Sequence, residues 1–223
     1  MSEAYPAFNP SASVDVRPEE LAARLAAKLC HDFVSPAGAI VSGLDLLDDP
    51  TAKDMRDEAM QLIGSSSRKL TDLLAFARVA FGSAVGQDSF ESGELERLTR
   101  GVFEHVRAEL DWAMPPQAAP KRAAVIVLNL AQLASGALPV GGVARVEMRA
   151  EGGAYQISVR AQGPRARLHA EVASGLAGEA LGDGLAGRWV QAFYVQAVAR
   201  GGGGQITAEA ADEVVRFRAT VPV

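Results

Sequence analysis

Two long stretches of helical periodicity at the start of this sequence limit its possible folds more than any other feature. The first runs from about Pro18 to Asp48, and after the turn Asp48-Asp49-Pro50-Thr51 the second runs to about Phe81. The apolar stripes consist of Leu21, Leu25, Leu29, Phe33, Ile40, Leu44 and Leu47 in the first stretch and of Leu62, Ile63, Ser66, Leu70, Leu73, Leu74 and Phe81 in the second. This pattern predicts an antiparallel helical hairpin.

The length of the hairpin leads to an expectation about assembly. At roughly 1.5 Å rise per residue, it contains about 40 Å of helix. A single partner helix covers such an apolar stripe on one side only. We therefore expect two chains to form a homodimer in which the two hairpins build a four-helix bundle.

The pattern changes between Gly82 and Ser89, where small and polar residues predict a domain boundary near Gly86. Beyond it, the sequence predicts helices around residues 94–110, 119–137 and 186–200, and an extended piece at 110–114. Alternating apolar and polar residues predict one strand pair at 144–149 and 155–160 and a second pair at 206–221. The expected fold is α+β, with a helical hairpin in residues 15–85 and an α/β sandwich in residues 86–223 whose helices cover one side of a mixed sheet.

The composition favours a globular chain with protein partners. Among 223 residues, 48% are hydrophobic and 22% are charged, and the net charge of −5 includes no long run of like charges, so we expect neither a nucleic-acid nor a membrane partner. No apolar stretch reaches the roughly 20 residues that span a bilayer. The single cysteine cannot form an internal disulfide, and the start of the chain lacks the pattern of a secretory signal, so we expect the cytoplasm.

His31 is the candidate functional residue of the first helix. At about 100° per residue the apolar stripe is centred roughly 200° away from it, so the imidazole is expected to point to solvent. Its neighbours three, four and seven residues away are Arg24, Ala27, Lys28, Val34, Ser35 and Gly38. The small neighbours would let a partner protein approach the ring, and the cations Arg24 and Lys28 could offset the charge of a phosphorylated imidazole. We assign these six residues to partner binding.

Asp32 completes the candidate catalytic pair. A carboxylate beside a working histidine commonly orients one ring nitrogen and leaves the other as the nucleophile. By position alone, an exposed surface histidine without a function is the more common interpretation of His31.

The segment His31-Asp32-Phe33-Val34-Ser35-Pro36 resembles the phosphorylation motif of sensor histidine kinases. In that motif, a histidine, an acidic residue, two variable positions, Ser or Thr, and Pro stand in the first helix of a dimerising hairpin. The order of hairpin, linker and following domain resembles the same kinases, and the chain is similar above all to the ChpT family of alphaproteobacterial histidine phosphotransferases. The resemblance implies a dimeric histidine phosphotransferase of a bacterial phosphorelay, whose second domain resembles a kinase ATP-binding domain.

The sequence departs from the kinases where they bind ATP. Leu133 stands in the position of a metal-binding Asn, four residues after Asn129, and a leucine offers no oxygen to a cation. Ala161 stands in place of the adenine-binding Asp, and Arg165 in place of a glycine. We therefore expect no ATP binding and no cofactor of the chain's own, and we expect the second domain to serve as a docking surface.

The remaining candidates have simpler interpretations. The loop Gly182–Gly187 could bind an anion through backbone amides, although a turn or helix cap is the more common role of a glycine cluster. Cys30 is expected to be a small interior residue, since free cysteine is so often buried. His105 and His169 have no Cys or His at ligand spacing, so both are expected to be incidental and no metal site is expected.

The expected mechanism is a two-step relay. His31 attacks a phosphorylated aspartate of a donor receiver domain, stores the group as a phosphoramidate, and passes it to an acceptor receiver domain. The family resemblance implies that the acidic pocket of the receiver supplies Mg²⁺. Two alternatives are an ATP-dependent histidine kinase with atypical nucleotide motifs and a non-catalytic dimerisation and interaction module.

Overall fold

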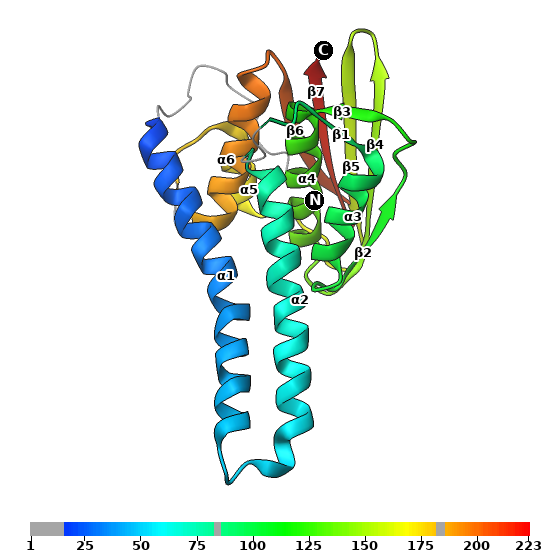
Figure 1. Ribbon diagram of the computed structural model, residues 1–223. Helices are drawn as coiled ribbons and strands as arrows, with labels where there is room; N and C mark the ends of the chain where they lie inside the picture. Colours follow the sequence, from blue (N-terminus) through cyan, green and yellow to red (C-terminus); the bar gives the residue numbers. More distant parts are fainter. Residues whose placement is uncertain (1–15, 83–85, 182–185) are drawn as a thin grey trace.

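The computed structural model describes residues 16–82, 86–181 and 186–223 (Figure 1). Helices α1 (Pro18–Asp48) and α2 (Arg56–Ala80) form the predicted antiparallel hairpin, and a 3₁₀ turn, η1 (Lys53–Met55), lies between them. At the hairpin tip, Oδ1 of Asp49 accepts hydrogen bonds from the hydroxyl of Thr51 at 2.6 Å and from its backbone N–H at 2.7 Å. These hydrogen bonds, the side-chain one first, favour the charged carboxylate and lower the pKa of Asp49.

The two hairpin helices approach most closely at Gly43. A Cβ atom there would lie 2.6 Å from Cγ1 of Ile63 and 3.1 Å from the carbonyl oxygen of Ala59, so glycine lets the backbones come together. Along α1 only Pro36 and Gly43 are buried. The apolar stripes are therefore covered on one side only.

Several apolar side chains of the hairpin remain exposed in the single chain. They are Val34, Val41 and Leu44 on α1 and Met60 and Leu74 on α2. Leu44 and Leu74 belong to the predicted apolar stripes, so a single chain covers these stripes only in part. Cys30 is also exposed, which corrects its expected interior position, because it lies on a face of α1 that no described residue of the same chain covers.

The C-terminal sandwich follows the hairpin. Its elements are β1 (Ser89–Glu91), α3 (Ser92–Phe103), β2 (Ala108–Trp112), β3 (Ala118–Pro120), α4 (Lys121–Gly136), β4 (Gly142–Glu151), β5 (Ala154–Gln162), α5 (Ala170–Ala177), α6 (Ala186–Arg200), β6 (Gln205–Ala211) and β7 (Val214–Pro222). The strands β2-β4-β5-β7-β6 form a mixed sheet in this order, and β1 pairs with β3 in a separate two-stranded ribbon. Only the β2–β4 pairing is parallel.

The sheet has one buried and one outer face. Along β4 and β5 the buried residues alternate with outward ones, as expected for a strand that packs on one side. Figure 1 shows α4, α5 and α6 gathered on the same side of the sheet. The predicted α+β fold, with helices covering one side of a mixed sheet, is confirmed.

Some predicted boundaries are wrong. The helix expected over 94–110 ends at Phe103, and Leu110 lies in β2, because pairing with β4 gives that segment an extended conformation that its own pattern does not require. The strands β1 and β3 and the helix α5 were not predicted. Strands of three residues are too short to display an alternating pattern.

The end of the hairpin belongs to the core of the sandwich. Phe76, Val79 and Ala80 of α2 are buried in the same apolar cluster as the sheet. Nδ2 of Asn129, on α4, donates a hydrogen bond to the carbonyl oxygen of Ala80 at 2.6 Å and to that of Val125 at 2.9 Å. The predicted boundary between hairpin and sandwich lies near Gly86. The residues directly before it, 83–85, lie outside the described residues.

No described helix is long and apolar enough to cross a membrane.

Candidate functional site

His31 lies on the exposed surface of α1. Its side chain is 89% exposed, as its position opposite the apolar stripe predicts. Its Nδ1 atom lies 3.3 Å from Oδ1 of Asp32, while Nζ of Lys28 donates to Oδ2 of the same carboxylate at 2.5 Å. Asp32 therefore contacts both its cationic neighbour and one nitrogen of the ring. For the Nε2 atom of His31, the described part of the chain offers no hydrogen-bond partner.

The two cations beside His31 are already paired. Lys28 is mostly buried, with 9% of its side chain exposed, and its Nζ lies 6.0 Å from the centre of the Phe81 ring. Arg24 forms an ion pair with Glu20 at 2.8 Å and lies 5.5 Å from the centre of the Trp189 ring. Intrahelical carboxylates and aromatic rings therefore hold both cations in place beside His31.

A cavity of about 590 Å³ lies between α1 and the sandwich. The hairpin contributes Arg24, Ala27, Lys28, His31 and Asp32 to its lining. From the sandwich it is lined by Gln132, Leu133, Ser135 and Gly136, by His169 and Val172, and by Ala186, Gly187, Arg188 and Gln191. Residues of the predicted face of α1 thus line one cavity together with residues of α4, α5 and α6.

The other predicted partner-binding residues lie outside this lining. Val34, Ser35 and Gly38 are exposed on α1 beyond the cavity, and the side chain of Val34 is 68% exposed. A Cβ at Gly38 would meet no atom within 4 Å, so the surface there is open. The exposed face of α1 therefore continues past the cavity.

His169 is a cavity residue that the sequence did not reveal. Its Nδ1 lies 3.2 Å from a guanidinium nitrogen of Arg188, and its Nε2 lies 3.3 Å from the carbonyl oxygen of Gly136. Burial, followed by the positive charges of Arg188 and Arg167, lowers the pKa of His169. The sequence predicts an incidental His169 because no Cys or His lies at ligand spacing, and the separation of His169 from His31 along the chain does not indicate that the fold brings both to one cavity.

Three amide side chains of the sandwich are linked by hydrogen bonds, and two of them, Gln132 and Gln191, line the cavity. Nε2 of Gln191 donates to Oδ1 of Asn129 at 3.1 Å and to Oε1 of Gln132 at 2.6 Å. Asn129 is fully buried, and its own amide donates to backbone carbonyls. The side chain of Asn129 therefore serves the packing of α2, α4 and α6 in this structure.

The residues that differ from the kinase motifs have distinct locations. Leu133 lines the cavity and is nearly buried. Ala161 is fully buried and lies within β5, opposite Ala144 and Val215, rather than after the strand as expected. Arg165 is exposed and has a positive φ of 59°. In the predicted loop Gly182–Gly187, residues 182–185 lie outside the described residues.

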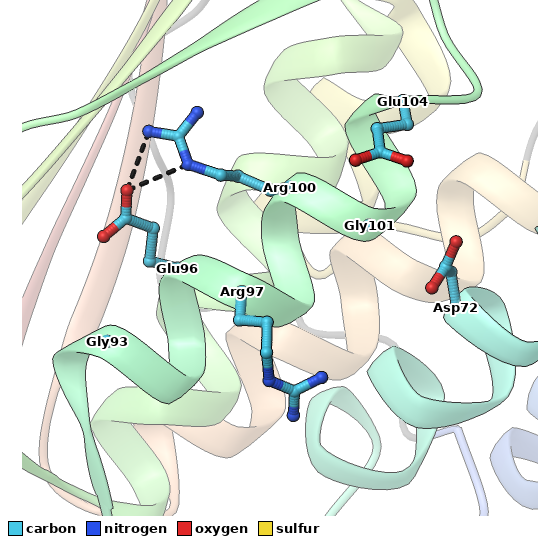
Figure 2. A pocket seen from close by; sticks show the side chains of 7 residues that line it. All are labelled: Asp72, Gly93, Glu96, Arg97, Arg100, Gly101 and Glu104. Atoms are coloured by element: carbon cyan, nitrogen blue, oxygen red, sulfur yellow. Dashed lines mark hydrogen bonds and ion pairs between the residues drawn. The ribbon is translucent and has the colours of Figure 1, made fainter.

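A second hollow, of about 400 Å³, lies between α2 and α3 (Figure 2). It is lined by charged side chains, among which Arg100 pairs with Glu96 at 2.7 Å. Oδ2 of Asp72, on its edge, lies 2.9 Å from Nε2 of His105. None of its lining residues belongs to the cavity at His31. Over the described ranges, no three His, Cys, Asp or Glu side chains come together as a metal site.

Comparison with known families assigns the sandwich. The family model described as the histidine phosphotransferase C-terminal domain matches residues 92–214. The chain belongs to this family. As a histidine phosphotransferase of the ChpT type, it is a phosphotransferase of a phosphorelay, and the expected resemblance is confirmed.

Individual relatives agree with this assignment. The protein phosphotransferase ChpT of Brucella abortus (strain 2308) is 29% identical over 90% of this chain and 95% of its own length. The solved structure of a bacterial phosphotransferase matches 93% of this histidine phosphotransferase and 99% of that chain, with 28% identity and a TM-score of 0.83.

Proposed function

We propose that His31 carries a phosphoryl group between aspartates of two response-regulator receiver domains. One observation carries this proposal: the His31 ring is held on one side by Asp32 and opens on the other toward solvent and the cavity. Such a ring has one oriented nitrogen and one available nucleophile.

The proposed chemistry follows from the contact with Asp32. An ionised carboxylate only accepts hydrogen bonds, so it favours the tautomer in which Nδ1 of His31 carries the proton. The lone pair of Nε2 then attacks the phosphorus of an aspartyl phosphate. The new N–P bond forms as the P–O bond to the aspartate breaks, and the receiver carboxylate leaves with the electron pair. The reverse attack by a second aspartate returns the neutral imidazole.

The ion pair beside His31 supports a role in positioning the ring. Lys28 and Asp32 form a fixed ion pair beside the ring, so the local charges are arranged before a partner arrives. Mg²⁺, in this proposal, comes with the acidic pocket of the receiver. This chain would contribute the nucleophile, its orientation and the docking surface.

We assign receiver docking to the exposed face of α1 together with the cavity edge of the sandwich. Val34, Ser35 and Gly38 present an open surface beside His31. A specific complex buries about 800 Å² on each partner, which is more than one helix face offers. The sandwich residues around the cavity, such as Arg188, would supply the remaining contacts.

The exposed apolar surface of the hairpin supports a homodimer. Val41, Leu44, Met60 and Leu74 are each about half exposed in one chain, between 49% and 56%. A second hairpin would cover such side chains in a four-helix bundle. We propose the hairpin as the dimerisation and phosphotransfer unit and the sandwich as the docking unit.

We further propose that this phosphotransferase does not use ATP. Leu133 brings an apolar side chain to the cavity, and Ala161 is buried in the sheet with no polar atom on its side chain. A magnesium nucleotide needs oxygen ligands and an acceptor for its adenine amino group, and neither residue provides them.

Transfer from a panel of isotope-labelled phospho-receivers tests the proposed function. The full chain should acquire acid-labile label from at least one receiver and pass it to a second. His31→Gln, and likewise His31→Ala, should abolish acceptance while circular dichroism and dimerisation remain unchanged, because the ring is not part of the core. Label on either variant would remove His31 from the mechanism, and absence of transfer from every receiver would favour the non-catalytic interaction module.

A further inference from the structure

A row of arginines crosses the outer face of the main sheet, away from the covering helices. In register, Arg145 of β4 is opposite Arg160 of β5, and Arg160 is opposite Arg216 of β7. The row ends in carboxylates at both sheet edges, with Asp111 of β2 opposite Arg145 and Glu209 of β6 opposite Arg216. Directly opposite residues share a face of the sheet, so these five side chains lie side by side.

The three central arginines repel one another. Like charges directly opposite in neighbouring strands destabilise a sheet. The nearby carboxylates serve the flanking arginines: Asp111 pairs with Arg145 at 2.6 Å, and Glu209 lies 4.0 Å from Arg216 and 2.9 Å from Arg218. Pairing with Asp111 and Glu147 raises the pKa of Arg145, so the charge on that side chain is firmly held.

Arg160 lies at the centre of the row and lacks such a counter-ion. Within the described parts of the chain it forms no ion pair, and its Nε atom is buried without a hydrogen-bond partner. Its neighbours along β5 on the same face, Ser158 and Gln162, are uncharged. An arginine held between two others, with a buried and unsatisfied donor, has a cost to folding that no internal contact offsets.

We propose that this arginine row is a docking surface for an acidic segment of a partner protein, which places two or more carboxylates over Arg160 and Arg216. The guanidinium fork matches a carboxylate in a bidentate arrangement. The positive strip is about 10 Å wide, because it covers three strands with spacings of about 4.8 Å. Carboxylates at both edges would repel the long phosphate backbone of a nucleic acid, whereas a short acidic segment fits between them.

The location of the row makes this surface independent of the phosphotransfer site. The cavity at His31 is lined by α1 and by helices that cover the opposite face of the sheet. A partner on the arginine row would therefore leave His31 accessible. This interaction would anchor the phosphotransferase to another protein while transfer continues.

A fluorescein-labelled peptide with three consecutive glutamates between glycines is the probe, because three extended residues span about 10 Å, the width of the strip. Fluorescence anisotropy with the full-length protein is the readout. Arg160→Gln should weaken binding about tenfold, the effect of losing one charge-assisted hydrogen-bonded contact. Arg216→Gln gives the same test at the second arginine of the row that the acidic segment would contact, and its side chain is 35% exposed on the outer face of the sheet. The matched control is Arg97→Gln, an exposed arginine of α3 on another surface (Figure 2), which should leave the affinity unchanged.

Thermal unfolding supplies a second readout. The peptide should raise the melting temperature of the wild-type protein and not that of Arg160→Gln, whereas Arg160→Gln without peptide should melt no lower than wild type, because a repulsion is removed. Equal affinities of Arg160→Gln, Arg216→Gln and Arg97→Gln would overturn the proposal. So would equally tight binding of a single-stranded oligonucleotide of the same charge, or a parallel loss of phosphoryl acceptance in Arg160→Gln.

Discussion

The Nδ1 atom of His31 lies 3.3 Å from Oδ1 of Asp32, and the other oxygen of that carboxylate is bonded to Lys28. Within one turn of α1, Asp32 thus contacts the cation Lys28 through one oxygen and the imidazole of His31 through the other. The contact of Asp32 with Nδ1 leaves Nε2 as the nitrogen of His31 that is open to a partner.

Replacing Asp32 should slow chemistry more than binding. Asp32→Asn can donate as well as accept a hydrogen bond, so it no longer selects the His31 tautomer, and we expect phosphoryl acceptance to slow at least about tenfold. Single-turnover transfer from a saturating phospho-receiver measures this rate. Asp45→Asn, at an exposed carboxylate on the same helix, is the control. A change confined to the receiver KM would contradict the orienting role of Asp32.

Val34 tests the docking surface on α1. Val34→Asp places a charge at a 68% exposed apolar position beside His31, and we expect it to raise the receiver KM about tenfold without loss of folding. Val140→Asp makes the same change at a 44% exposed valine of the sandwich that lies outside the cavity lining. If the two variants transferred equally well at limiting receiver concentration, the receiver would not dock at Val34.

Asn129 should contribute to stability. Asn129→Ala leaves the buried Ala80 carbonyl oxygen without its side-chain donor and removes one of the two acceptors of the Gln191 amide, so we expect the free energy of unfolding to fall by about 2–3 kcal/mol. Urea unfolding measures the change. Ser135→Ala, a half-buried position on the same helix, should cost less than about 1 kcal/mol. Equal losses in both variants would argue against a special role for Asn129.

His169 should titrate below its usual pKa of 6.5. Its imidazole signal in an NMR titration should move toward the usual pKa in Arg188→Gln, although only partly, since burial is the larger cause. As the pH falls below about 6.5, the unfolded chain takes up this proton before the folded chain does, so the free energy of unfolding decreases over that range. His169→Gln should remove this part of the pH dependence. An unshifted His169 signal in the wild type would contradict the contact with Arg188.

ATP should not bind at millimolar concentration. Leu133 and Ala161 lack the oxygen atoms that a magnesium nucleotide requires. Isothermal calorimetry with MgATP should show no saturable heat. Saturable binding that ADP competes away would restore the ATP-dependent kinase as the leading function.

The helices and strands that could be predicted from the sequence are those with one buried face, because such a face repeats apolar residues at helical or alternating spacing. The bounds of α1 match the prediction at Pro18 and Asp48, and β4 and β5 contain the strand pair predicted at 144–149 and 155–160. The short strands β1 and β3 were missed because their conformation depends on pairing with a distant segment. Cys30 was misplaced because residue preferences for burial do not reveal which face of an amphipathic helix its own chain covers.

The site was predictable only along one helix. Helical spacing brought Arg24, Lys28 and Asp32 to His31, since residues one turn apart are neighbours. The contribution of His169 and Arg188 depends on how α5 and α6 pack against α1. No local pattern encodes that packing.

The contact between Asn129 and Ala80 also bears on how the molecule can move. The last turn of α2 shares its core with α4, through Phe76 and Val79, so swinging the sandwich away from the hairpin would expose these side chains to water. Burial of two such side chains is worth roughly 3–6 kcal/mol, which keeps a hinge at this point closed nearly all the time. The width of the cavity beside His31 is therefore set when the chain folds. Under the proposed function, a receiver domain would bind at a preformed cavity instead of one that closes around it.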